Sequence, residues 1–220
     1  MNNFDVEVFE EIRTLCLMAL DAIETADRVL MGSRSAPPDN LANWTHEQLR
    51  EYFDEGRKIS VTVFRNVHSF ISCCANISKL VWIDPRDRNS LRRHCGVDEP
   101  ILVEIERKLE EIRLTLDLAN NNTFHWKNRG IRNALAHYNV RLFALMAETG
   151  NMSSFRICTS DKIDDRALGT TAKSCMRTLV VDTGEYIFQG EAYNLDQMKQ
   201  DVRTLLKLVL EKHPMLFVSW

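Results

Sequence analysis

Apolar residues recur at helical spacing from the start of the chain. They alternate at three- and four-residue steps, the pattern of one buried helix face: Phe9, Ile12, Cys16, Ala19, Ile23, Ala26 and Leu30. Met31-Gly32-Ser33 stops this helix, and the proline-containing segment 36–40 predicts a loop. The pattern therefore predicts a long first helix that ends close to residue 30.

A second long helix is predicted from the Thr45/Gln48 pair onward. A Thr followed three residues later by a Gln is a capping box, in which each side chain satisfies a backbone N–H at the helix start. The apolar face continues to about Leu80, and Asp84-Pro85 ends the helix. Residues 84–96 are predicted as an Arg-rich connection with no more than one short helical turn.

Two further helices repeat the same three-four spacing of apolar residues. Asp98 caps the first, whose stripe from Leu102 to Leu116 runs to the break at residues 120–122. Asn194 caps the last, whose stripe runs from Leu195 to Val209. Between them, segment 123–146 predicts another helix, with Thr123 as its cap.

The residue composition changes before the last helix. Residues 177–182 and 185–192 are rich in β-branched and aromatic side chains, and Asp182-Thr183-Gly184 joins them as a hairpin turn. Only 8 Gly and 5 Pro occur in 220 residues, which disfavours a many-stranded fold. We therefore predict an all-α bundle of about five helices, forming a single domain over residues 1–220, with a small β-hairpin inserted at about 175–193 before the last helix.

The location follows from what the chain lacks. No apolar run approaches the length of a membrane span, and residues 1–5 lack the basic start of a secretory signal. We expect a cytoplasmic protein with no membrane contact and with its six cysteines reduced. Cys73 and Cys74 near His68 are interpreted as buried packing residues, because their spacing does not suit shared metal ligation.

Charge is unevenly distributed although the net charge is only −3. Residues 1–55 are strongly acidic, and segment 98–117 is also acidic. Segment 121–147 contains no acid and four bases, which are Lys127, Arg129, Arg132 and Arg141. A basic helix of this kind is either a solvated face or a cradle for phosphate groups.

The predicted basic helix carries one polar constellation. Arg129, Asn133, His137 and Arg141 follow one another at four-residue steps and therefore share a face, while Arg132 can reach toward the same ligand. Asn133, one turn before His137, can orient the imidazole. A neutral His can take the proton of a ribose 2′-hydroxyl, and an Arg can hold the phosphate as charge develops.

This chemistry selects RNA and requires a second proton-transfer group. Only RNA carries the internal 2′-hydroxyl nucleophile. One helix supplies one His, so we expect a homodimer in which two such helices face each other across a twofold axis. No cofactor and no metal are expected, since no Gly-rich phosphate loop or clustered metal-ligand set is present in the sequence.

The segment from Gly130 to Asn139 resembles the signature of the HEPN superfamily. Arg132-Asn133 followed by His137 matches its pattern of an Arg, a polar residue and a His after a short spacer. The resemblance implies a dimeric helical bundle that acts as a metal-independent endoribonuclease, with Arg132 and His137 catalytic and Asn133 orienting. It also implies a toxin–antitoxin, antiviral or RNA-processing setting, with an antitoxin or regulatory protein as partner. One branch of the family has a modified Tyr two residues after the His, where this chain has Asn139, so that regulation is not carried over.

Three alternatives to this assignment stay open. Arg88-Asn89 with His94 satisfies a looser form of the motif, although its position after Asp84-Pro85 favours a solvated basic loop. The second alternative is a catalytically silent dimeric module that binds RNA or nucleotides. The third is a helical interaction protein in which the motif is a coincidence. The expected RNA contacts are Lys127, Arg129, Arg141, Tyr138 and Asn139; His125 and Trp126 contact RNA or pack in the bundle.

Overall fold

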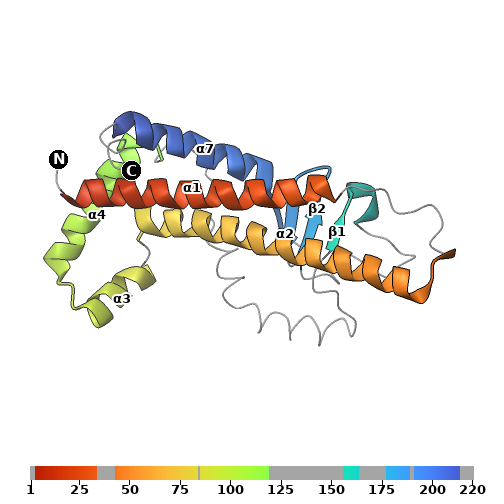
Figure 1. Ribbon diagram of the computed structural model, residues 1–220. Coiled ribbons are helices and arrows are strands. Elements are labelled where there is room, and N and C mark those ends of the chain that lie inside the picture. The colour runs from red at the N-terminus through yellow and green to blue at the C-terminus, as the bar shows by residue number, and fades with distance from the viewer. Residues whose placement is uncertain are drawn as a thin grey trace. The chain divides into compact units, whose positions relative to one another are not determined.

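A computed structural model shows a mainly helical chain with a small sheet (Figure 1). It describes residues 3–33, 43–83, 85–118, 156–163, 177–188 and 191–213. The described helices are α1 (Asn3–Gly32), α2 (His46–Val81), α3 (Pro85–Cys95), α4 (Glu99–Thr115) and α7 (Leu195–Lys212), with a 3-10 turn, η3, at Ser160–Lys162. None of these helices is long and apolar enough to cross a bilayer.

The sheet comes before α7, as the sequence predicts. Its strands lie in the order β1 (Arg156–Cys158), β2 (Arg177–Val180), β3 (Glu185–Phe188) and β4 (Glu191–Asn194). β1 pairs parallel to β2, while β2, β3 and β4 pair antiparallel in turn. Gly184 has φ of +65° in the β2–β3 turn, a backbone conformation that glycine adopts without strain. The all-α prediction with an inserted hairpin is therefore confirmed.

The described chain divides into two compact units, and the divisions fall within α1, α2 and α7. The first unit comprises the start of α1, the end of α2, α3, α4 and most of α7; the second comprises the end of α1, most of α2 and the sheet. The single-domain assignment stays a prediction.

The first unit is built on the predicted apolar stripes. Ile12 and Cys16 of α1, Leu102 of α4 and Val202 and Leu205 of α7 are each 0 % exposed. The Arg113 guanidinium of α4 donates to the Val81 carbonyl at 2.6 Å and so satisfies an acceptor at the end of α2. The regular spacing of apolar residues thus predicts the core of this unit correctly.

The second unit packs the sheet against α2. Tyr186 and Phe188 of β3 are buried, and the Tyr186 ring lies 6.3 Å from that of Phe64 on α2, centroid to centroid. An isolated hairpin is marginal in water, so this apolar face stabilises it. Figure 1 shows the strands beside α2.

Two predicted helix starts are confirmed in detail. The Thr45 N–H donates to Gln48 Oε1 at 2.9 Å, and the Gln48 N–H donates to Thr45 Oγ1 at 3.3 Å, a complete capping box. Asn194 Oδ1 accepts the Gln197 N–H at 2.8 Å at the start of α7. Asp98 occupies the cap position of α4 but makes no side-chain capping bond.

The predictions for residues 85–95, for the end of α4 and for the number of strands are wrong. Residues 85–95 form a helix of 11 residues, α3, where the sequence predicted a connection with one turn at most. α4 ends at Thr115 rather than near residue 120, because Asp117 adopts a left-handed conformation with φ of 52° and the Leu118 N–H turns back to the Arg113 carbonyl. The predicted second hairpin strand is two strands, β3 and β4, and the short β1 was missed.

Candidate functional site

The predicted catalytic helix lies outside the described residues. Segment 119–155 contains every residue of the predicted catalytic and RNA-binding set: Lys127, Arg129, Arg132, Asn133, His137, Tyr138, Asn139 and Arg141. The predicted helix 123–146 belongs to the same segment. Their roles stay predictions. The described residues bear on these roles because they include other Arg and His residues that could form the site instead.

The competing Arg88-Asn89…His94 motif lies on helix α3 and not in a loop. Arg88 pairs with Glu99, and its Nη1 lies 3.3 Å from Glu106 Oε1, both on α4. His94 is exposed in the last turn of α3. Arg88 therefore fastens α3 to α4, and its charge is compensated within the chain.

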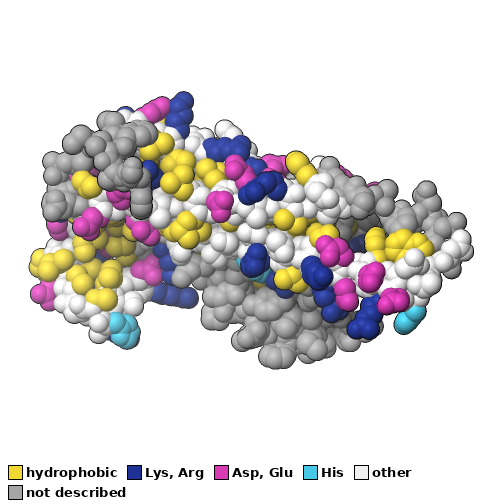
Figure 2. All heavy atoms as spheres, in the orientation of Figure 1, with side chains coloured by type: hydrophobic (Ala, Val, Ile, Leu, Met, Phe, Trp, Pro, Cys, Tyr) yellow, Lys and Arg dark blue, Asp and Glu magenta, His cyan; other side chains and the backbone are white. Residues whose placement is uncertain are grey.

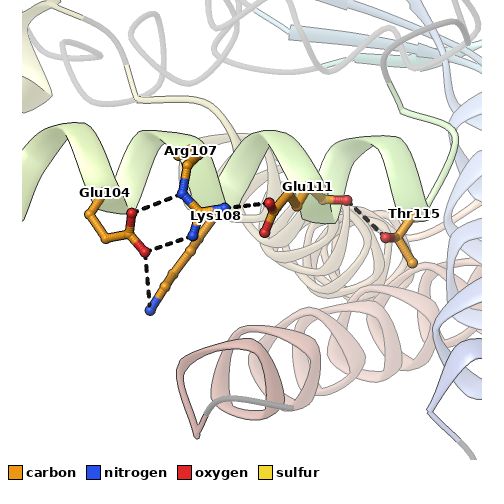
Figure 3. Close-up of polar contacts among 5 residues, drawn as sticks. All are labelled: Glu104, Arg107, Lys108, Glu111 and Thr115. Carbon is orange, nitrogen blue, oxygen red and sulfur yellow. Dashed lines mark hydrogen bonds and ion pairs between the residues drawn. The ribbon is translucent and has the colours of Figure 1, made fainter.

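The exposed face of α4 is likewise compensated by its own charges (Figure 3). The Arg107 guanidinium binds both carboxylate oxygens of Glu104, at 2.8 and 2.7 Å, and also pairs with Glu111. Hydrogen bonding from Arg107 lowers the pKa of the Glu104 carboxyl. Lys108 Nζ lies 3.9 Å from Glu104 and 5.2 Å from the centroid of the Phe4 ring. This face is a ladder of ion pairs rather than an acidic surface open to a partner.

A polar cluster that the sequence did not reveal lies in the second unit. Nε2 of His68, on α2, is 2.8 Å from the hydroxyl oxygen of Tyr186, on β3. The same nitrogen is 3.4 Å from Nη1 of Arg177, at the start of β2. The Arg177 guanidinium lies over the Phe64 ring, 5.5 Å from its centroid. Residues far apart in the chain thus meet around one imidazole nitrogen.

The chemistry of this cluster fixes the state of His68. Nε2 of His68 has a single lone pair when it is unprotonated, and Tyr186 is its hydrogen-bond partner at 2.8 Å. Arg177 Nη1 can only donate and lies further away, at 3.4 Å, which favours the tautomer in which Nδ1 carries the proton and the Tyr186 hydroxyl donates to Nε2. Burial and the positive charge of Arg177 lower the pKa of His68 to about 4, which keeps the ring neutral at pH 7.

His68 therefore fits a structural role better than a catalytic one. Its basic nitrogen is engaged by Tyr186 and Arg177, so it is not placed to take a proton from a substrate. Tyr186 is completely buried, and the bond to His68 satisfies its hydroxyl. The sequence gives no local sign of the contact between His68 and Tyr186, because 118 positions separate the two residues.

Three cysteines contribute to packing in the first unit. Cys16, Cys73 and Cys74 are buried, which agrees with the interpretation of Cys73 and Cys74 as packing residues. Burial raises the pKa of the Cys16 thiol to about 12 and also raises the pKa values of Cys73 and Cys74. These thiols are therefore protonated and poor nucleophiles at neutral pH. In the described ranges, His, Cys, Asp and Glu form no group of three or more that could hold a metal ion.

Comparisons with known proteins give no assignment: no family model, no curated protein and no solved structure matches this chain.

Proposed function

We propose that this protein is a metal-independent endoribonuclease of the HEPN type, with Arg132 and His137 as its catalytic residues. The observation that carries the proposal is the motif Arg132-Asn133…His137 within an acid-free, basic segment of a mainly helical chain. The segment follows α4 and precedes the sheet, so the motif falls late in the succession of helices.

The contacts of Arg88 on α3 and of His68 on α2 favour this assignment. Arg88 is held by Glu99 and Glu106, and Nε2 of His68 is hydrogen-bonded to Tyr186 and lies 3.4 Å from Arg177 Nη1. An imidazole used as a base needs a free lone pair, and an arginine that binds phosphate needs a charge that is not already compensated. Neither set meets these requirements, which supports the motif at Arg132 and His137.

The proposed reaction is an internal transesterification of RNA. Neutral His137 accepts the proton of a ribose 2′-hydroxyl, whose oxygen attacks the adjacent phosphorus as the bond from phosphorus to the 5′-oxygen breaks. Arg132 stabilises the negative charge that develops on the phosphoryl oxygens. A protonated His137 from the second protomer of a homodimer donates a proton to the departing 5′-oxygen. The products are a 2′,3′-cyclic phosphate and a free 5′-hydroxyl.

Replacement of His137 tests the proposal against a silent binding module. We expect His137→Ala to reduce RNA cleavage in EDTA by about 100-fold or more, because it removes the general base and acid. RNA affinity, measured by fluorescence anisotropy, is expected to stay within a fewfold of that of the unchanged protein. Cleavage that His137→Ala leaves intact would contradict the proposal. Binding that depends on Arg132, with no cleavage by the unchanged protein, would favour the binding module.

A further inference from the structure

An apolar pocket with one loosely held cation lies in the first unit. Its volume is about 380 Å³, within the range of small-ligand sites. The lining comes from α1, α3, α4, the end of α2 and Ile83, two residues beyond α2; it is mostly apolar and includes Phe4 and Leu109. Figure 2 shows hydrophobic side chains, in yellow, gathered over α3 and α4.

The charged lining of the pocket is one Lys and one Asp. Lys79 Nζ, near the end of α2, lies 4.0 Å from Asp87 Oδ1 on α3, at the limit of an ion pair. Each side chain is 33 % exposed. The ammonium has three donors, and Asp87 is its single charged contact among the described residues. Asp87 has a further interaction of its own, so it does not belong to Lys79 alone.

The cations around the pocket differ in how firmly they are held. Arg88 pairs with Glu99 and Glu106, and Lys108 lies between Glu104 and the Phe4 ring. Lys79 is the cation that lines the pocket and whose pairing is weakest. An anionic group would pair with Lys79 in competition with the Asp87 carboxylate, which lines the same pocket, while an attached apolar body would cover the neighbouring apolar side chains.

We propose that this pocket binds a small amphiphile that carries a carboxylate, with the carboxylate at Lys79 and the apolar chain inside. A volume of about 380 Å³ lies at the lower end of the range of small-ligand sites, which suits a short acyl chain. Decanoate is a suitable probe. The site is independent of the proposed ribonuclease function, because it shares no residue with the Arg132/His137 motif.

Cys95 provides a direct readout of occupancy. Its thiol lines the pocket and is exposed, whereas Cys16, Cys73 and Cys74 are buried. The rate of Cys95 alkylation by iodoacetamide is followed by peptide mass spectrometry, with decanoate added below its micelle concentration. We expect decanoate to slow alkylation of Cys95 in a saturable way and to leave Cys158, on β1, unaffected.

Matched variants test the two parts of the proposal. Ser90 and Asn89 are both exposed on α3, but only Ser90 lines the pocket. Ser90→Trp is expected to abolish protection by decanoate, and Asn89→Trp to preserve it. Lys79→Gln is expected to raise the half-saturating concentration about tenfold, through loss of one charge-assisted contact.

Three results would overturn the proposal. They are an alkylation rate of Cys95 that decanoate does not change, equal protection by decyltrimethylammonium, and protection that survives Ser90→Trp. Because the assay uses no RNA, its outcome and that of the cleavage test are separate.

Discussion

Nε2 of His68 lies 2.8 Å from the hydroxyl of Tyr186 and joins α2 to the sheet through a neutral imidazole. Arg177 is the charged group facing the same nitrogen, at 3.4 Å. Protonation of Nε2 would remove the acceptor and place two positive charges together. The contact thus makes the second unit sensitive to acid.

The stability of the folded chain should depend on pH through His68. The pKa of His68 falls from 6.5 to about 4 on folding, so the unfolded chain binds a proton that the folded chain does not. The resulting stabilisation is present above pH 6.5 and is lost as pH falls toward 4. We expect His68→Gln to lessen the acid-induced loss by about 1–2 kcal/mol, a value discounted for the partial exposure of the ring.

Urea denaturation at pH 7.0, 6.0, 5.0 and 4.5 measures this difference. Burial also lowers the pKa of His213, but that residue is common to both proteins and cancels in the comparison. His94→Gln, at an exposed position on α3, serves as the matched control. Identical pH dependence in His68→Gln and the unchanged protein would show that the imidazole is not held neutral by these contacts.

The second prediction compares three Gly→Ala changes. Gly184 and Gly96 both have φ of +65°, so alanine there is strained, and each change is expected to cost about 1 kcal/mol. A Cβ at Gly184 would also lie 2.5 Å from Asp196 Oδ2, which adds to the cost unless that side chain rotates. Gly56 lies inside α2 with open space around it, and alanine there should stabilise by about 0.5–1 kcal/mol. Thermal unfolding gives the three values, and a stabilising Gly184→Ala would refute the turn geometry.

The third prediction uses two phenylalanines on one helix. Phe70 is 0 % exposed and Phe53 is 64 % exposed, both on α2. Phe70→Ala should cost about 3–5 kcal/mol by opening a cavity, whereas Phe53→Ala should change stability by about 0.5 kcal/mol or less. Equal effects in chemical denaturation would mean that the exposed end of α2 is covered in solution.

The fourth prediction separates the two Arg motifs. Arg88→Ala removes ion pairs between α3 and α4, so a modest loss of stability is expected, with RNA cleavage within twofold of the unchanged protein. Arg132→Ala should lower cleavage by about 100-fold, as loss of one charge-stabilising donor does at other active sites. The same single-turnover assay measures both, and a reversed order would move the candidate site to α3.

Local patterns predicted the long elements well because each carries its own signal. The stripe from Phe9 to Ala26 is buried, and Thr45/Gln48 and Asn194 cap their helices as expected. These features need only residues close together in the chain. The β2–β3 turn at Gly184 was predictable for the same reason.

The failures share a different cause, which is dependence on distant partners. α3 carries no apolar stripe in its sequence, and none of its residues is buried. It is held instead by the pairing of Arg88 with α4 and by an acidic first turn and a basic last turn, which suit the helix dipole. The three residues of β1 form a strand by pairing with β2 across a long separation in sequence. The contact of His68 with Tyr186 is equally non-local.

The candidate catalytic motif was found because its residues lie within a few positions of one another on one predicted helix. The proposed apolar pocket could not be found in this way, since four helices contribute to it. Lys79 and Asp87 meet there from separate helices, and no spacing rule connects them.

The most direct test of the central claim is the chemistry of the RNA ends after incubation with the purified protein in EDTA. An oligoribonucleotide is compared with a copy in which the nucleotide on the 5′ side of the cleaved bond is 2′-deoxy. Attack by the 2′-hydroxyl should give a 2′,3′-cyclic phosphate and a 5′-hydroxyl from the first substrate and no cleavage at that position in the second. Cleavage of the 2′-deoxy copy, or products that carry a 5′-phosphate, would contradict it.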